Sequence, residues 1–135
     1  MKLADVVRRR ANGLCEYCHV SESAYRRNFH MEHIIARSHG GSSSLDNLAL
    51  ACWRCNWRKG PNLSALDGDD LVPLFHPRRD TWDHHFAALT YAPPGGIEIR
   101  GLTPTGRATA HLLGFNEPIR QILRYQLTQS PPPAR

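Results

Sequence analysis

The sequence predicts an α+β fold in which a small zinc-stapled finger is followed by a C-terminal helical extension. All four cysteines lie within the first 55 of the 135 residues, in two matched Cys-x-x-Cys pairs. Segments with the two-residue period of strands and segments with the 3.6-residue period of helices both occur around these pairs. Because so short a finger buries little apolar surface, we expect a bound metal ion to help it fold.

We divide the chain at Pro61, after which no cysteine remains and the composition changes. Residues 1–61 form the predicted finger, and residues 62–129 form a mixed, mainly helical extension that packs on it. Residues 130–135 are rich in proline, and we expect them to be a disordered tail.

The formal net charge of +5 suits a polyanionic partner such as nucleic acid. Arginine supplies 15 of the 17 positive residues, and its guanidinium binds phosphate in a bidentate way that lysine does not. Codon bias in a GC-rich genome explains the same preference equally well. No segment reaches the roughly 20 apolar residues that span a bilayer, and the start lacks a signal-like apolar run. We therefore expect a soluble cytoplasmic protein with no membrane partner.

The two cysteine pairs predict one structural zinc site. Two cysteines that are separated by two residues place both sulfurs on one ion, and four thiolates complete a tetrahedral Zn²⁺ site with no open position. The interval between the pairs is long enough to hold a hairpin. The alternatives are redox thiols or a coincidence of spacing, but close pairs in a reducing compartment favour metal binding. The ligands are Cys15, Cys18, Cys52 and Cys55.

The elements of the finger follow from local patterns. Apolar residues at helical spacing predict a helix over residues 3–11, which ends at Gly13. Three adjacent arginines, residues 8–10, would cover its outer side, either as a solvated face or as a phosphate contact. Residues 21–28 form a short helix or a polar loop. We then predict a strand at 29–35, a loop at 38–46, a second strand at 48–51 and a helix at 52–59 that ends at Gly60.

The extension shows fewer clear patterns. Residues 97–102 alternate as a strand does. Thr103 and Pro104 form a typical helix start, a hydroxyl cap followed by proline, and that helix ends at Gly114. A further helix opens at Asn116. Several histidines and aspartates occur between residues 76 and 85, but their spacing does not match a common metal motif.

The finger carries a set of residues that matches a known family. The run His30-Met-Glu-His33 is followed by Gly40-Gly41, by Leu45-Asp-Asn47-Leu48, and by Cys52-x-x-Cys55-Asn56-x-x-Lys59-Gly60. Over about residues 3–61 this combination resembles the HNH endonucleases. The resemblance implies a treble-clef-like ββα-metal finger, often flanked by two Cys-x-x-Cys pairs. The three residues that give the family its name correspond to His33, Asn47 and Asn56, with asparagine in the third place.

The resemblance also implies a role for each residue. His33 would be the general base that takes a proton from water. Glu32 and Asn56 would give oxygen ligands to one catalytic Mg²⁺ or Mn²⁺, and Asn47 would fix the loop and orient His33. Neighbours on an ideal strand point to opposite faces, so Glu32 and His33 share a site only if the strand bends or ends there. Otherwise His30 shares the face of Glu32.

Further residues are candidates for substrate contact. His30 is a reserve metal ligand or a phosphate contact, and His39 is a candidate phosphate contact. Arg54, Arg58 and Lys59 lie around the predicted helix, as a phosphate-binding edge or as an ordinary solvated face. Two tryptophans, residues 53 and 57, share a four-residue spacing, which favours packing against the extension over stacking with bases.

We therefore predict a metal-dependent endonuclease that hydrolyses DNA, as a monomer or a homodimer. The resemblance implies cleavage in the minor groove to give a 5′-phosphate and a 3′-hydroxyl. RNA stays open as a substrate. The alternative is a noncatalytic zinc-finger-like module that binds DNA or RNA. Glu32, His33 and Asn56 separate the two hypotheses, because binding alone requires none of them. A purely structural zinc protein leaves the same three residues unexplained.

Overall fold

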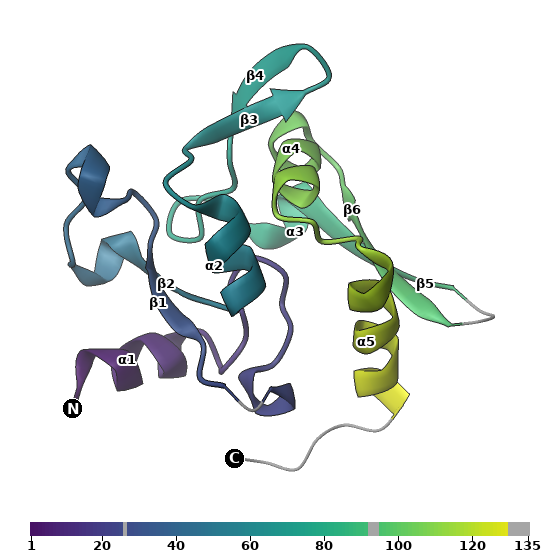
Figure 1. Cartoon of the computed structure of the whole chain (residues 1–135), viewed down its shortest axis with the longest axis horizontal. Coiled ribbons are helices and arrows are strands. Elements are labelled where there is room, and N and C mark those ends of the chain that lie inside the picture. The colour runs from purple at the N-terminus through teal and green to yellow at the C-terminus, as the bar shows by residue number, and fades with distance from the viewer. Residues whose placement is uncertain (26, 92–94, 130–135) are drawn as a thin grey trace.

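The finger is a two-stranded hairpin followed by a helix, with an N-terminal helix packed beside it (Figure 1). We analysed a computed structural model, which describes residues 1–25, 27–91 and 95–129. The finger contains α1 (Leu3–Arg10), β1 (His30–His33), β2 (Leu48–Ala51) and α2 (Trp53–Lys59), with short 3₁₀ turns η1 (Glu22–Ala24), η2 (Arg37–His39) and η3 (Leu45–Asn47). The predicted order of strand, loop, strand and helix is confirmed, although β1 is shorter than the predicted strand.

The hairpin is antiparallel and pairs His30 with Ala51 and His33 with Leu48. β2 is buried along its whole length, whereas β1 alternates only in part. α2 packs against both strands on one side and lies next to the extension on the other (Figure 1). The helix therefore connects the hairpin to the rest of the molecule.

Two of the three adjacent arginines of α1 hold that helix in place. Arg10 donates hydrogen bonds to the carbonyls of Leu45 and Leu48, at 2.7 and 2.6 Å. Arg8 pairs with the buried carboxylate of Glu22 at 3.1 Å. Neither interpretation from the sequence, a solvated face or a phosphate contact, describes these two side chains.

In the part that the structure describes, the extension contains two hairpins and three helices. Its elements are β3 (Ser64–Asp67), β4 (Asp70–Pro73), α3 (Trp82–His85), β5 (Phe86–Tyr91), β6 (Gly96–Gly101), α4 (Pro104–Leu112) and α5 (Pro118–Gln129). The mixed fold class is confirmed. The strand at 97–102 and both helices after it also match the prediction, and Thr103 caps α4 through the N–H of Gly106. The predicted tail, 130–135, lies outside the described residues.

The other three strands of the extension, β3, β4 and β5, were not predicted from the sequence. The β3–β4 hairpin projects from the molecule (Figure 1), and its exposed leucines give no inward-facing apolar pattern. Its turn does carry a signal, because Asp67 is followed by Gly68, which adopts a φ of 60°.

One hydrophobic core joins the finger to the extension. The ring of Phe75 lies edge-on to Tyr17 at 6.4 Å and to Phe86 at 5.4 Å, and Phe86 contacts Phe115 at 5.5 Å. Trp82 donates from its indole nitrogen to the carbonyl of Tyr17 at 2.8 Å. Tyr17 lies between the first two cysteines, so the extension packs directly on the first cysteine pair.

None of the helices in the described part of the chain has both the length and the apolar character needed to cross a bilayer.

Candidate metal centre and nuclease site

The four cysteines converge on one point at the centre of the molecule. Their sulfurs all lie within 4.8 Å of one another, and those of Cys18 and Cys52 are 3.8 Å apart. A tetrahedral ion with Zn–S bonds of about 2.3 Å requires sulfurs about 3.8 Å apart. Among the described residues this is the one cluster of His, Cys, Asp and Glu with the geometry of a metal site. A four-cysteine structural zinc site is therefore compatible with the fold.

Local backbone geometry aims each pair of sulfurs. The N–H of Cys18 points at the sulfur of Cys15, at 3.5 Å, and the N–H of Cys55 points at the sulfur of Cys52, at 3.4 Å. His19 completes the first turn with a φ of 64°. Cys52 is itself the N-cap of α2, so the second pair of ligands is built into the helix start.

The surroundings of the thiols favour a bound cation. All four cysteines are buried, and burial raises the pKa of the Cys15 and Cys55 thiols well above the usual range. Thiolates in such a place need a positive charge to hold them in the ionised form.

Arg120 brings one such charge from the far end of the chain. Its guanidinium lies 3.2 Å from the sulfur of Cys55 and 3.9 Å from that of Cys52. The same group donates to the carbonyls of Leu113 and Gly114, at 2.7 and 3.0 Å. Burial lowers the pKa of Arg120, but the thiolates of Cys55 and Cys18 more than reverse this effect, and the pKa is raised. No sequence pattern predicts this contact.

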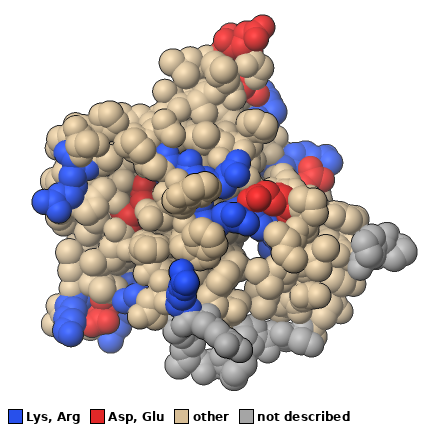
Figure 2. All heavy atoms as spheres, viewed as in Figure 1, with Lys and Arg blue, Asp and Glu red and all other residues tan. Residues whose placement is uncertain are grey.

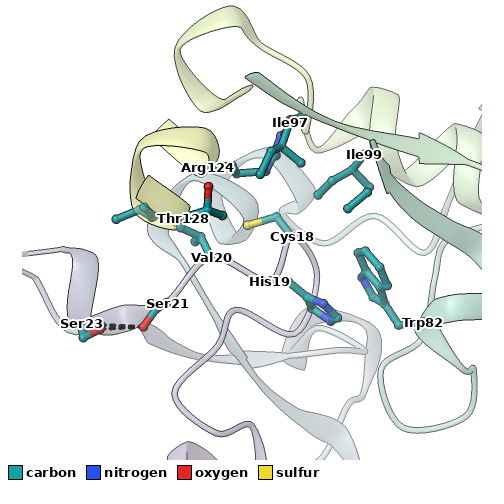
Figure 3. A pocket seen from close by; sticks show the side chains of 12 residues that line it. Cys18, His19, Val20, Ser21, Ser23, Trp82, Ile97, Ile99, Arg124 and Thr128 are labelled. Atoms are coloured by element: carbon teal, nitrogen blue, oxygen red, sulfur yellow. Dashed lines mark hydrogen bonds between the residues drawn. The ribbon is translucent and has the colours of Figure 1, made fainter. Parts of the chain in front are cut away.

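A cavity of about 500 Å³ lies beside the first cysteine pair, between the finger and the extension (Figure 3). Cys18 and His19 face it from one side, and Ile97 and Ile99 face it from the other. His19 is exposed, as predicted, and stacks on Trp82 at 3.9 Å. The walls are mainly apolar, which suits the interface between finger and extension rather than a phosphodiester backbone.

His33 lies at the end of β1, partly exposed, where a base could reach water. Its Nε2 lies 2.9 Å from the hydroxyl of Ser43 in the following loop. In the tautomer that donates through Nε2, the lone pair of Nδ1 stays available to accept a proton. Ser43 is a contact that the sequence did not single out, because it is one of three consecutive serines.

Asn47 holds the loop that carries Ser43. Its amide oxygen accepts from the N–H of Ile35 at 2.9 Å, and its amide nitrogen donates to the carbonyls of Ile35 and Ser42, at 2.9 and 2.7 Å. The two arms of the loop are thereby joined. The backbone carbonyl of Asn47 also accepts the N–H of Ile34, the residue after His33, at 2.9 Å. The role of Asn47 in orienting His33 stays a prediction.

The glycine pair in this loop serves two needs. Gly40 adopts a φ of 87°, which favours glycine. Gly41 has no space for a side chain, because a Cβ there would lie 1.7 Å from the carbonyl oxygen of Ile35. The turn predicted from Gly40-Gly41 is present, and only the first glycine has a positive φ.

Glu32 points away from His33, as expected for neighbours on a regular strand. Only 5 % of Glu32 is exposed. One carboxylate oxygen lies 2.7 Å from the ammonium of Lys59, and the other accepts the hydroxyl of Tyr17 at 2.6 Å. Burial raises the pKa of Glu32, and the Lys59 charge partly opposes this effect. The ammonium of Lys59 therefore stands where an ion bound by Glu32 would be.

Lys59 is 2 % exposed and also donates to the carbonyl of Ile34 at 2.8 Å. The prediction that Lys59 contacts phosphate is wrong, because its charge is neutralised inside the finger. Asn56, three residues earlier on α2, is partly exposed. Among the described residues its side chain has no hydrogen-bond partner, so its amide oxygen is available.

The remaining candidates lie on the surface of the finger. His30 and His39 are exposed. Arg54 lies 3.5 Å from Glu117, and Arg58 donates to the carbonyl of Leu112 at 3.0 Å, so both arginines of α2 reach towards the extension. The prediction that Trp53 and Trp57 pack in the core is wrong, because they are 41 % and 69 % exposed.

With this geometry in place, comparison with known proteins gives one family. Residues 14–62 match the HNH endonuclease family model. The matched segment contains both cysteine pairs, β1, β2 and α2, so the HNH segment coincides with the hairpin and helix of the finger. The comparisons with curated proteins and with solved structures gave no match. The family consists of nucleases that act on nucleic acids and use divalent metals, and the extension lies outside the match.

Proposed function

We propose that this chain is an endonuclease that hydrolyses phosphodiester bonds in DNA and that Mg²⁺ or Mn²⁺ supports the reaction. The observation that carries the proposal is the HNH match over residues 14–62, the segment that forms the β1–β2 hairpin and α2. His33 is the last residue of β1 and is partly exposed, and the loop that follows it is joined by hydrogen bonds of Asn47.

His33 is the proposed general base. A neutral imidazole accepts a proton from water near neutral pH, and the resulting hydroxide attacks phosphorus. The bond from phosphorus to the 3′ oxygen breaks, and that oxygen takes a proton from solvent, which leaves a 5′-phosphate and a 3′-hydroxyl. The hydrogen bond to Ser43 restricts rotation of the ring. Asn47 acts as a positioning residue, because it joins Ile35 to Ser42 and so sets the place of Ser43.

The residues present provide only part of what a divalent metal ion needs. A hard divalent ion would stabilise charge on the phosphate and on the departing oxygen. Asn56 offers an available oxygen, but the carboxylate of Glu32 is held by Lys59. This arrangement does not fit a direct Glu32 ligand, and we assign no step to an ion at that position.

A plasmid-cleavage assay tests the proposal, with the zinc-loaded protein and with Mg²⁺ or Mn²⁺ added or omitted. Chelators are avoided because they would also remove zinc. We expect the wild type to nick or linearise the plasmid and His33→Ala to lose about 10²- to 10⁴-fold in rate. His111→Ala is the matched control, since it removes an exposed histidine from α4, outside the matched segment. Unchanged cleavage by His33→Ala would remove His33 from the mechanism.

The second candidate function is a noncatalytic module that binds DNA or RNA. The observation that favours it is the Glu32–Lys59 pair, in which Lys59 holds the carboxylate that a catalytic ion would need. This function predicts that the wild type shifts a labelled oligonucleotide in a binding assay but leaves all DNA forms uncut, with either metal ion present.

A further inference from the structure

The most exposed large side chain on α2 is a tryptophan. Trp57 is 69 % exposed, and Trp53, four residues earlier, is 41 % exposed. Side chains four residues apart stand next to each other on one face of a helix. Two adjacent indoles on a rigid helix leave a flat apolar surface in water, and this exposure is unfavourable unless a ligand covers it.

The position of this surface on α2 links it to the proposed nuclease site. Residues advance by about 100° around a helix. Asn56 therefore lies between the buried face of α2 and the two tryptophans, and Arg54 and Arg58 lie on the far side of them. A strand that extends from Asn56 crosses the indoles before it reaches the arginines. The guanidinium of Arg54 already lies 5.2 Å from the Trp53 ring centroid.

A small cavity continues the surface at the other end. It has a volume of about 220 Å³ and is lined by Tyr25, Arg27 and Phe29, together with Trp53. Tyr25 and Phe29 are arranged edge to face at 5.4 Å. Nucleobases stack on flat aromatic side chains, and a neighbouring arginine contacts the phosphate by charge.

We propose that Trp53 and Trp57, with this cavity, bind unpaired bases of the nucleic-acid substrate. The inference rests on the proposed nuclease function and names its substrate class, which is single-stranded nucleic acid or duplex with unpaired bases. In an intact duplex each base face is covered by its neighbours, so an indole reaches a base face only where stacking is broken.

Charge favours nucleic acid over a protein as the occupant. The chain carries a net charge of +5, and basic side chains gather over α2 on the face shown in Figure 2. Arg27 is exposed and has no ion-pair partner within the described part of the chain. A second copy of the chain would bring the same positive charge to the same surface.

Fluorescence anisotropy tests the inference with a labelled single strand of about 12 nucleotides and the matching duplex, without added Mg²⁺ or Mn²⁺. We expect the wild type to bind the single strand more tightly than the duplex. Trp57→Ala should weaken single-strand binding about tenfold, within the range for loss of one base stack, and should change duplex binding less than twofold. Trp57→Phe should retain most of the affinity.

Leu66→Ala is the matched control, because Leu66 is a 58 % exposed apolar residue on the β3–β4 hairpin. It should leave both affinities unchanged. Equal affinity of Trp57→Ala and wild type for the single strand would overturn the inference. The inference would also be overturned if Trp57→Ala abolished self-association of the protein in a sedimentation experiment but left nucleic-acid binding intact, because the tryptophans would then contact a second copy of the chain. Failure of the wild type to bind any oligonucleotide would instead refute the proposed function itself.

Discussion

Replacing Arg120 with methionine should weaken zinc retention more than any other single change in the extension. The guanidinium contacts the sulfurs of Cys55 and Cys52, at 3.2 and 3.9 Å, and is 8 % exposed. A Zn²⁺ ion neutralises only half the charge of four thiolates, and Arg120 offsets part of the remainder. Methionine keeps the length and the apolar stem but removes the charge and all the donors.

Two magnitudes follow from these contacts. Loss of an outer-shell partner typically lowers metal affinity by 10- to 100-fold. The carbonyls of Leu113 and Gly114 also lose their donor, and breaking a buried charged contact costs about 3–5 kcal/mol in the free energy of unfolding. The assays are the rate of zinc transfer to a coloured chelator and thermal unfolding of the zinc-loaded protein.

Arg124 provides the control for Arg120. It lies one turn later on α5, is equally buried, and donates to the backbone carbonyls of Ile97 and Phe115. Arg124→Met should therefore destabilise the fold without speeding zinc transfer at a temperature where the protein stays folded. Equal zinc transfer rates for Arg120→Met, Arg124→Met and wild type would refute the role of the sulfur contact.

Three further predictions concern the finger. Cys15→Ser should prevent folding of the finger, which loss of the near-ultraviolet circular dichroism signal would reveal; a folded, zinc-free variant would contradict this. Asn47→Ala should lower the free energy of unfolding by about 2–4 kcal/mol, since three hydrogen bonds are lost. Asn56→Ala should instead reduce the rate of cleavage and leave the midpoint of denaturation unchanged. Lys59→Met should lower the free energy of unfolding by about 3–5 kcal/mol, and Glu32→Gln should lower it by less. If the two losses simply add in the double variant, the two residues do not interact.

The cysteine and histidine–asparagine pattern could be predicted from the sequence because its geometry is local. A Cys-x-x-Cys turn aims two sulfurs with its own backbone, and the loop that follows β1 returns Asn47 to the end of that strand. The loop contacts of Asn47 are local as well, since they join it to residues only 5 and 12 positions away. Contacts between residues so close in sequence form in any fold that keeps this segment intact.

Contacts between distant segments could not be predicted in this way. Arg120 lies 65 positions after Cys55, and no periodicity in either segment indicates that they meet. The pairing of Glu32 with Lys59 crosses from β1 to α2, and the family pattern directed both residues to the substrate instead. The tryptophans of α2 have the spacing of a buried face, but Cys52, Cys55 and Lys59 occupy the face that is buried.

The burial of Lys59 and the exposure of Trp57 have one common cause. Because Cys52 and Cys55 must point at the zinc site, the orientation of α2 about its axis is fixed, and every other residue of the helix follows from it. Lys59 is then turned into the finger, where Glu32 neutralises its charge and the carbonyl of Ile34 accepts its hydrogen bond. Trp57 is turned outward and cannot pack on the extension. The zinc ligands thus decide which side chains of α2 a substrate can reach, and a metal-binding constraint on the helix becomes a constraint on what the proposed nuclease recognises.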